Sequence, residues 1–230
     1  MTLDATPKPL PLAFSDPRGA GTPVLLVHGF GHNRVVWEKL VGALPADLRP
    51  ISVDLRGHAD SPWSPAGEYD LGCYAADLEA LTIALGLDRL HVVAHSLGGS
   101  IATLFAARNS ARIASLTLVD TGPALESSGS SHVVDEVASG LRSFATVAEY
   151  RASLSAIHPL GDRELLDRLA ETGLVRRLDG RFEPALDPGV VGDGGTPEQL
   201  AETTRQLWQA LAALECPVLV VRGGLSAILS

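Results

Sequence analysis

Short apolar runs alternate with amphipathic stretches through the first half of the chain. The runs are rich in β-branched residues and lie at 24–27, 51–55, 90–94 and 116–119, with a fifth at 218–221. Continuous apolar runs of this length are typical of parallel strands buried on both faces. The stretches between them show helical spacing and lie at 33–44, 70–85 (with Asp70 as a suitable N-cap) and 97–108. The alternation predicts an α/β protein with a mostly parallel sheet flanked by helices.

The pattern changes over residues 121–216, which contain no apolar run typical of a buried strand. This region predicts helices joined by polar connections, at 132–144, 147–157, 162–176 and 197–213, with a loop rich in glycine and proline at 179–196. So long a segment between two strands of one sheet is unusual for a simple crossover. We therefore expect a core formed by residues 1–120 and 217–230, with a helical lid inserted at 121–216.

Composition and charge restrict the class of protein. A hydrophobic fraction of 46% over 230 residues is sufficient for one folded domain with an insertion. The formal net charge is −9 and no run of Lys or Arg is present. Nucleic acid and anionic membrane surfaces are therefore not expected partners, and no apolar run approaches the ~18 residues of a membrane span.

Cysteine and the N-terminal sequence add two further expectations. The two cysteines, Cys73 and Cys216, are too few for a disulfide framework and show no spacing typical of a zinc site. The N-terminus has no basic region followed by an apolar one, as a secretory signal would have. We expect a cytoplasmic protein that uses no metal or organic cofactor.

The strongest chemical signal is the segment Ala94-His95-Ser96-Leu97-Gly98-Gly99, which joins a predicted strand to a predicted helix. A serine on such a sharp turn adopts a strained backbone, and small residues on either side allow close approach of the neighbouring chain. The helix N-terminus and its free N–H groups would stabilise negative charge beside the hydroxyl. This pattern predicts a nucleophilic Ser96; the alternative is that Ser96 only caps the helix.

A second turn, His28-Gly29-Phe30-Gly31, follows the strand predicted at 24–27. Its backbone could direct the N–H of Phe30 to the same point as the N–H of Leu97, and two such donors form an oxyanion hole. By itself a His-Gly pair after a strand is also consistent with an ordinary β-turn. The combination with Ser96 favours the oxyanion hole.

These two motifs, together with Asp54-Leu55-Arg56-Gly57-His58 and the segment 217–223, resemble the α/β-hydrolase superfamily. The resemblance is to its lid-bearing branch of esterases, lactonases, carbon–carbon bond hydrolases and cofactor-free haloperoxidases, and it runs from about residue 10 to the last residue. It implies a short N-terminal strand at 10–15 and a lid at 121–216. It also implies that Asp54, Arg56 and His58 hold loops together and are not catalytic.

In this family a serine nucleophile needs a histidine base and an orienting acid. The resemblance places the acid near position 227, where this chain has Ala227, and the histidine beyond an eighth strand, whereas the sequence ends at Ser230. We therefore expect that the last strand and helix of the fold are absent and that this is a fragment of a longer protein, or that another chain covers the sheet edge. Asp120, at the end of a strand, is either a replacement acid or a turn residue.

The histidines of this sequence offer no clear substitute base. In extended chain, His95 should point away from the Ser96 hydroxyl, because neighbouring side chains alternate between faces. We assign Gly29, His32 and His95 to the substrate pocket. His132 and His158 fall in the predicted lid.

Two functions follow from these expectations. The first is hydrolysis of a small, largely apolar ester, lactone or carbon–carbon bond substrate through Ser96, with doubtful activity in this stretch alone. The second is a non-catalytic ligand-binding or interaction protein on the same fold that has lost the triad acid. In either case the apolar edge at 217–221 predicts self-association.

Overall fold

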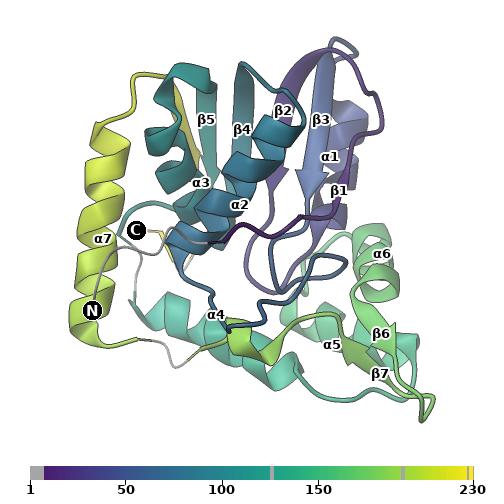
Figure 1. Ribbon diagram of the computed structural model, residues 1–230. Coiled ribbons are helices and arrows are strands. Elements are labelled where there is room, and N and C mark those ends of the chain that lie inside the picture. Colours follow the sequence, from purple (N-terminus) through teal and green to yellow (C-terminus); the bar gives the residue numbers. More distant parts are fainter. Residues whose placement is uncertain (1–7, 125–126, 193–194, 227, 230) are drawn as a thin grey trace.

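The computed structural model describes residues 8–124, 127–192, 195–226, 228 and 229. Its main sheet has the strand order β1-β3-β2-β4-β5-β8 (Figure 1). The strands are β1 (Phe14–Ser15), β2 (Thr22–Val27), β3 (Leu48–Val53), β4 (Leu90–His95), β5 (Ile113–Val119) and β8 (Val218–Val221). Every neighbouring pair is parallel except β1 and β3. The predicted α/β architecture is confirmed, and the N-terminal strand expected at 10–15 is limited to β1 at Phe14–Ser15.

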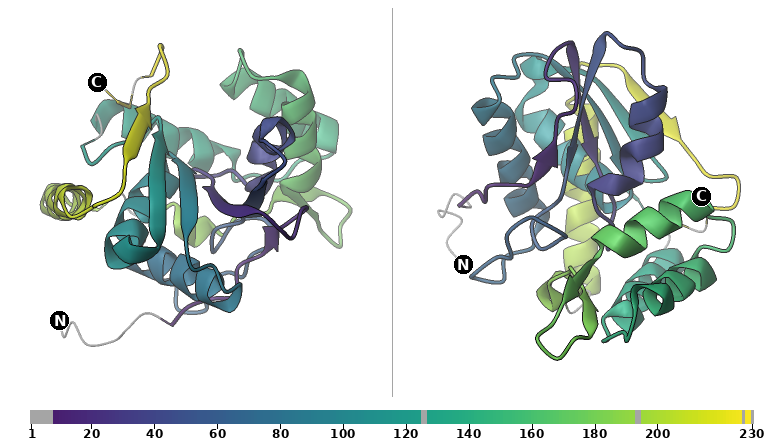
Figure 2. Two further views of the ribbon diagram at one scale, coloured as in Figure 1. Left: turned by 90° about the horizontal axis from the view of Figure 1, so that it is seen from above. Right: turned by 90° about the vertical axis from the view of Figure 1, so that its right-hand side faces the viewer.

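Helices cover both faces of this sheet (Figure 2). One face carries α2 (Leu71–Ala84), α3 (Leu97–Arg108) and α7 (Pro197–Ala212), and the other carries α1 (Glu38–Ala43) with the 3-10 turn Arg34–Trp37 before it. Side chains of β2 alternate accordingly: Leu25 and Val27 join the larger core under α2 and α3, while Val24 and Leu26 pack with Trp37. The sheet is therefore apolar on both sides, as its continuous apolar runs predict.

The segment between β5 and α7 lies beyond the carboxyl ends of the strands (Figures 1 and 2). It contains α4 (Ser127–Gly140), α5 (Val147–Ile157), α6 (Arg163–Thr172), a hairpin of β6 (Leu174–Arg176) and β7 (Phe182–Pro184), and the 3-10 turn Pro188–Val190. The expected helix at 162–176 is too long, because Gly173 ends α6 and the next three residues pair with β7. The loop expected at 179–196 likewise contains β7.

The last helix of the region 121–216, α7, contacts the core of the sheet domain. Although it lies inside the range 121–216, α7 packs along α3, and Leu211 and Leu214 at its end join the core cluster. It leads into β8, which occupies the edge of the sheet beside β5. Within the described residues, no helix is long and apolar enough to cross a membrane.

Candidate active site

Ser96 lies at the sharp turn between β4 and α3. Its backbone has φ +50° and ψ −122°, a region that side-chain-bearing residues rarely adopt, and its hydroxyl makes no capping hydrogen bond to the helix. The strained turn predicted from the sequence is present, and the hydroxyl does not make the capping bond on which the alternative role of Ser96 depends. A strained residue without a capping role is typical of a functional site.

Gly98 and Gly99 allow α3 to begin close to its neighbours. A Cβ at Gly98 would overlap the carbonyl oxygen of His28 and lie 2.7 Å from that of Val27. A Cβ at Gly99 would overlap the Thr121 methyl group. The two glycines therefore bring the first turn of α3 against the end of β2 and the end of β5.

Two buried histidines hold the turn that follows β2. His28 accepts a hydrogen bond from the Leu55 N–H at Nε2 (3.0 Å) and has its Nδ1 2.7 Å from the Gly29 carbonyl. His58 accepts a hydrogen bond from the Gly31 N–H (3.3 Å), and its Nδ1 lies 2.9 Å from the Arg56 carbonyl. Burial lowers the pKa of His58 to about 4 and that of His28 well below its ordinary value. Both rings are neutral at pH 7 and fix the backbone around Phe30.

The two predicted oxyanion donors have no acceptor. Among the described residues, the N–H of Phe30 has no hydrogen-bond partner, and neither has the N–H of Leu97. Leu97 is the first residue of α3, where the N–H has no intrahelical acceptor. Both half-buried residues therefore keep an unpaired backbone N–H among the described residues.

A cavity of about 250 Å³ lies between these turns and the segment that follows β5. Of the predicted site residues, Phe30, His32, His95 and Ser96 line it. The opposite side is mostly apolar and is formed by Val133, Val137, Leu141, Leu154, Ile157, Leu169 and Leu186. Polar groups of the same region that also line it are Glu136, Tyr150, Ser153 and His158.

The alternation of an extended chain predicts that His95 points away from Ser96. In the structure the two residues instead lie on the same cavity. Both side chains line the same cavity, and Ser96 Cβ and His95 Cε1 each lie 3.1 Å from the point where a Gly29 Cβ would sit. The positive φ of Ser96 ends the extended conformation at that residue, so the alternation no longer applies. Gly29 itself lies behind the His95 ring, where only a residue without a side chain fits.

Three histidines form a row along the cavity. The ring of His32 lies 5.9 Å from that of His95 and 5.8 Å from that of His158, measured between centroids. Burial lowers the pKa of His32 to about 3 and also lowers the pKa values of His95 and His158. In the part of the chain that the structure describes, no group of three or more His, Cys, Asp or Glu side chains is arranged to hold a metal ion.

Asp120 connects the ends of β5 and β8. It has φ +51°, its N–H donates to the Val221 carbonyl (2.7 Å), and its carboxylate accepts from the Gly223 N–H (3.1 Å). Its negative charge opposes the burial that lowers the pKa of His95. The described contacts are those of a turn residue, with no hydrogen bond to a described histidine. Ala227 lies outside the described residues.

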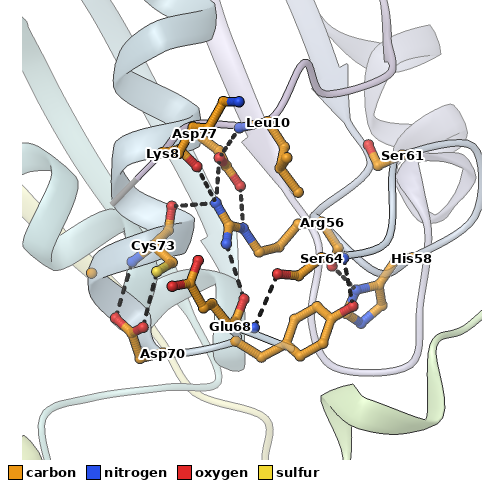
Figure 3. Close-up of polar contacts among 12 residues, drawn as sticks. Lys8, Leu10, Arg56, His58, Ser61, Ser64, Glu68, Asp70, Cys73 and Asp77 are labelled. Atoms are coloured by element: carbon orange, nitrogen blue, oxygen red, sulfur yellow. Dashed lines mark hydrogen bonds and ion pairs between the residues drawn. The ribbon is translucent and has the colours of Figure 1, made fainter. Parts of the chain in front are cut away.

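The residues expected to hold loops together form buried ion pairs. The Arg56 guanidinium binds the Asp77 carboxylate of α2 through two hydrogen bonds (2.6 and 2.7 Å), and both side chains are 1% exposed (Figure 3). Asp77 also accepts from the Leu10 N–H (2.6 Å), so the pair ties the N-terminal segment to α2. Asp54 accepts from the backbone and the side chain of Arg34. These groups support the loops below the cavity and are not among its lining residues.

Residues 22–162, more than half of the chain, match the family model described as alpha/beta hydrolase fold. The chain is 31% identical to the crystal structure of an alpha/beta hydrolase from Novosphingobium aromaticivorans, with TM-score 0.77, over 95% of this chain and 79% of that one. It is 36% identical to a serine hydrolase-like protein of Danio rerio over 44% of this chain and 31% of that protein.

A third relative aligns over most of the sequence. The 3-hydroxybutyrate-oligomer hydrolase of Cupriavidus necator is 28% identical over 217 residues, which is 90% of this chain and 73% of that protein. The matched stretch spans only about a third of several other curated relatives. On the family model and the fold together, the chain belongs to the α/β-hydrolase family.

Proposed function

We propose that this chain carries the nucleophilic and substrate-binding part of a hydrolase that acts on small, largely apolar esters, lactones or carbon–carbon bond substrates. Ser96 is the nucleophile, and the N–H groups of Phe30 and Leu97 form the oxyanion hole. The proposal rests on the position of Ser96 at the carboxyl end of β4 on a mostly apolar cavity. Its backbone is strained there, and its hydroxyl makes no capping bond. The unpaired N–H groups of Phe30 and Leu97 support the proposal.

In this mechanism the Ser96 hydroxyl attacks the substrate carbonyl carbon, and the carbonyl oxygen becomes an oxyanion. Each backbone donor to that oxyanion contributes ~3–4 kcal/mol of transition-state stabilisation. The dipole of α3 acts in the same direction, because its N-terminus lies at the reacting group. The proton of Ser96 passes to a general base, which protonates the leaving group as its bond to the carbonyl carbon breaks. Water then hydrolyses the acyl-Ser96 ester and restores the serine.

The lack of a hydrogen-bonded base at Ser96 among the described residues limits the activity that we expect of these 230 residues. No described imidazole is hydrogen-bonded to the Ser96 hydroxyl. An active site that lacks a member of its triad keeps only the roughly 10³–10⁴-fold acceleration supplied by the oxyanion hole and binding. We therefore propose slow turnover for this chain alone.

The cavity determines the size and polarity of the substrate. A volume of about 250 Å³ is near the lower end of small-molecule sites, and the apolar residues from α4, α5 and α6 surround most of it. We propose that these helices and the β6–β7 hairpin act as a lid. The Cupriavidus necator relative is named for 3-hydroxybutyrate oligomers, which supports placing esters of short acids first among the substrate classes.

A second candidate function is a ligand-binding protein on the same fold. It is favoured by the lack of a hydrogen-bonded base at Ser96 among the described residues. Such a protein would bind small esters in the cavity without hydrolysing them.

We also propose that the chain self-associates through β8. All four residues of this edge strand are apolar and exposed, with Leu219 at 58%, and one side of the strand has no described partner strand. Exposed apolar edge strands pair readily with another chain. The occupant that we propose is a second copy of this chain.

Hydrolysis of p-nitrophenyl butyrate tests the enzymatic proposal. We expect release of p-nitrophenol above the uncatalysed rate. Because the oxyanion hole and binding supply most of that excess, Ser96→Ala should lower it without abolishing it. Ser153→Ala is the matched control, since Ser153 also lines the cavity but lies on α5. Binding of the ester without Ser96-dependent hydrolysis would favour the ligand-binding function.

A further inference from the structure

The row of His32, His95 and His158 forms a polar wall of the cavity. These residues come from three different parts of the fold: the turn after β2, the end of β4 and the position just beyond α5. All three line the cavity that contains Ser96. The wall therefore faces the substrate, although its members are far apart in the sequence.

The imidazoles of this wall have unused hydrogen-bonding capacity. Among the described residues, none of their ring nitrogens has a hydrogen-bond partner. Of the nitrogens in these three rings, only His32 Nδ1 is fully buried. The other ring nitrogens are therefore accessible to a ligand in the cavity. A partly buried imidazole without a partner is unusual, because polar groups removed from water are normally paired.

The charge state of the wall restricts the group that it can bind. Burial lowers the pKa of His32 to about 3 and lowers those of His95 and His158, so the rings are neutral at pH 7. A neutral imidazole offers one donor and one acceptor, which matches a hydroxyl or carbonyl group. Glu136 brings a carboxylate to the same cavity, and this disfavours a second negative charge.

The position of the wall indicates where on the substrate this group lies. The His32 ring lies 5.9 Å from that of His95, which adjoins Ser96 beside Gly29. Val133, Val137 and Ile157, in contrast, lie in the segment that covers the cavity. A substrate with its carbonyl at Ser96 would place its first few carbons along the histidines. The rest of its chain would contact the apolar side.

We propose that His32, with His95 and His158, is a specificity determinant that selects esters bearing an uncharged hydroxyl or carbonyl group a few bonds from the scissile carbonyl. Esters with a free carboxylate are rejected. This inference rests on the proposed function, because it takes Ser96 as the reacting end of the cavity.

Binding of three matched esters to the Ser96→Ala chain tests the proposal without turnover. The probes are methyl hexanoate, methyl 3-hydroxyhexanoate and monomethyl adipate, and calorimetry gives their dissociation constants. One added hydrogen bond predicts that the hydroxy ester binds about fivefold more tightly than methyl hexanoate. Monomethyl adipate should bind more weakly than either.

Variants of the wall separate polarity from shape. His32→Phe keeps a ring between the other two histidines, and it should reduce the ratio of the affinities for the hydroxy ester and methyl hexanoate to about one. His158→Phe should lower the same preference and serves as an independent variant. His91→Phe is the matched control, because His91 lies near the start of β4 outside the cavity lining, and the preference should not change.

The outcomes distinguish this inference from the function on which it rests. Equal affinity for methyl hexanoate and methyl 3-hydroxyhexanoate, or a preference that persists in both wall variants, would overturn the histidine proposal and leave the ester site intact. Tighter binding of monomethyl adipate would also overturn it. If none of the three esters bound, the proposed function would fail together with the inference.

Discussion

At the residue scale, the buried histidines of this protein have two distinct roles. His28 and His58 are 0% and 1% exposed, and backbone groups satisfy their ring nitrogens. The rings of His32 and His158 are also removed from solvent, but their nitrogens have no hydrogen-bond partner among the described residues, and both residues line the cavity. Hydrogen bonding, and not burial alone, therefore separates the histidines that hold the backbone from those available to a ligand.

The neutral state of His28 and His58 predicts a loss of stability in mild acid. Their folded pKa values lie below the unfolded value of about 6.5, so only the unfolded state gains protons as the pH falls through 6.5. Between about pH 7.5 and about pH 5.5, His58 should lower the free energy of unfolding by about 1 kcal/mol, and His28 should act in the same direction. Urea unfolding at the two pH values measures this loss.

Substitution of His58 assigns part of that loss to one ring. His58→Gln should reduce the pH dependence by about 1 kcal/mol, although the variant is less stable at both pH values. An undiminished pH dependence in His58→Gln would contradict the assignment.

Gly98 should be intolerant of any side chain. Gly98→Ala forces a Cβ against the carbonyl oxygens of Val27 and His28, and overpacking of this kind costs about 1–3 kcal/mol of unfolding free energy. Gly42→Ala, in α1, meets nothing within 4 Å and should stabilise by about 0.5–1 kcal/mol. Thermal unfolding of the two variants compares them, and equal melting temperatures would contradict the close approach of α3.

At the scale of elements, the Arg56–Asp77 pair fixes α2 to the loop after β3 and to the N-terminal segment (Figure 3). Asp77→Leu leaves a buried guanidinium without its partner, which costs about 3–5 kcal/mol. Arg56→Met combined with Asp77→Leu should recover much of this loss, because both charges are then removed. Glu202→Leu, at the exposed pair with Arg205, should change the unfolding free energy very little. A mild effect of Asp77→Leu in urea unfolding would contradict the account.

The sequence predicts the core elements better than the segment that follows β5. Apolar runs locate β2, β4, β5 and β8, because strands buried on both faces need them. The hairpin of β6 and β7 is short and half exposed, so no apolar run marks it. His158 could not be assigned to the cavity from the sequence, since only tertiary packing of α5 brings it beside His32.

At the scale of the whole molecule, the sheet is covered on both faces but open at the β8 edge (Figure 2). Light scattering coupled to size exclusion should show species larger than the monomer, increasing with protein concentration. Leu219→Lys places a charge on the edge and should shift the population to monomer. Leu200→Lys, at an exposed leucine of α7, should not. A monomer at every concentration would contradict self-association.

The arrangement of the layers places the chemistry between the sheet and the segment beyond β5. Ser96 and Phe30 lie at the carboxyl ends of neighbouring strands, and the mostly apolar side of the cavity comes from the helices above them. Crevices outside the carboxyl ends of strands are the usual ligand sites of α/β sheets. The central claim is that this placement makes Ser96 the reacting nucleophile of the cavity.

Reaction with a fluorophosphonate probe, followed by peptide mapping, tests that claim most directly. The account predicts one covalent adduct per chain, carried by Ser96, absent in Ser96→Ala and retained in Ser153→Ala. An adduct on Ser153, or a folded, ester-binding chain that carries no adduct at all, would contradict it.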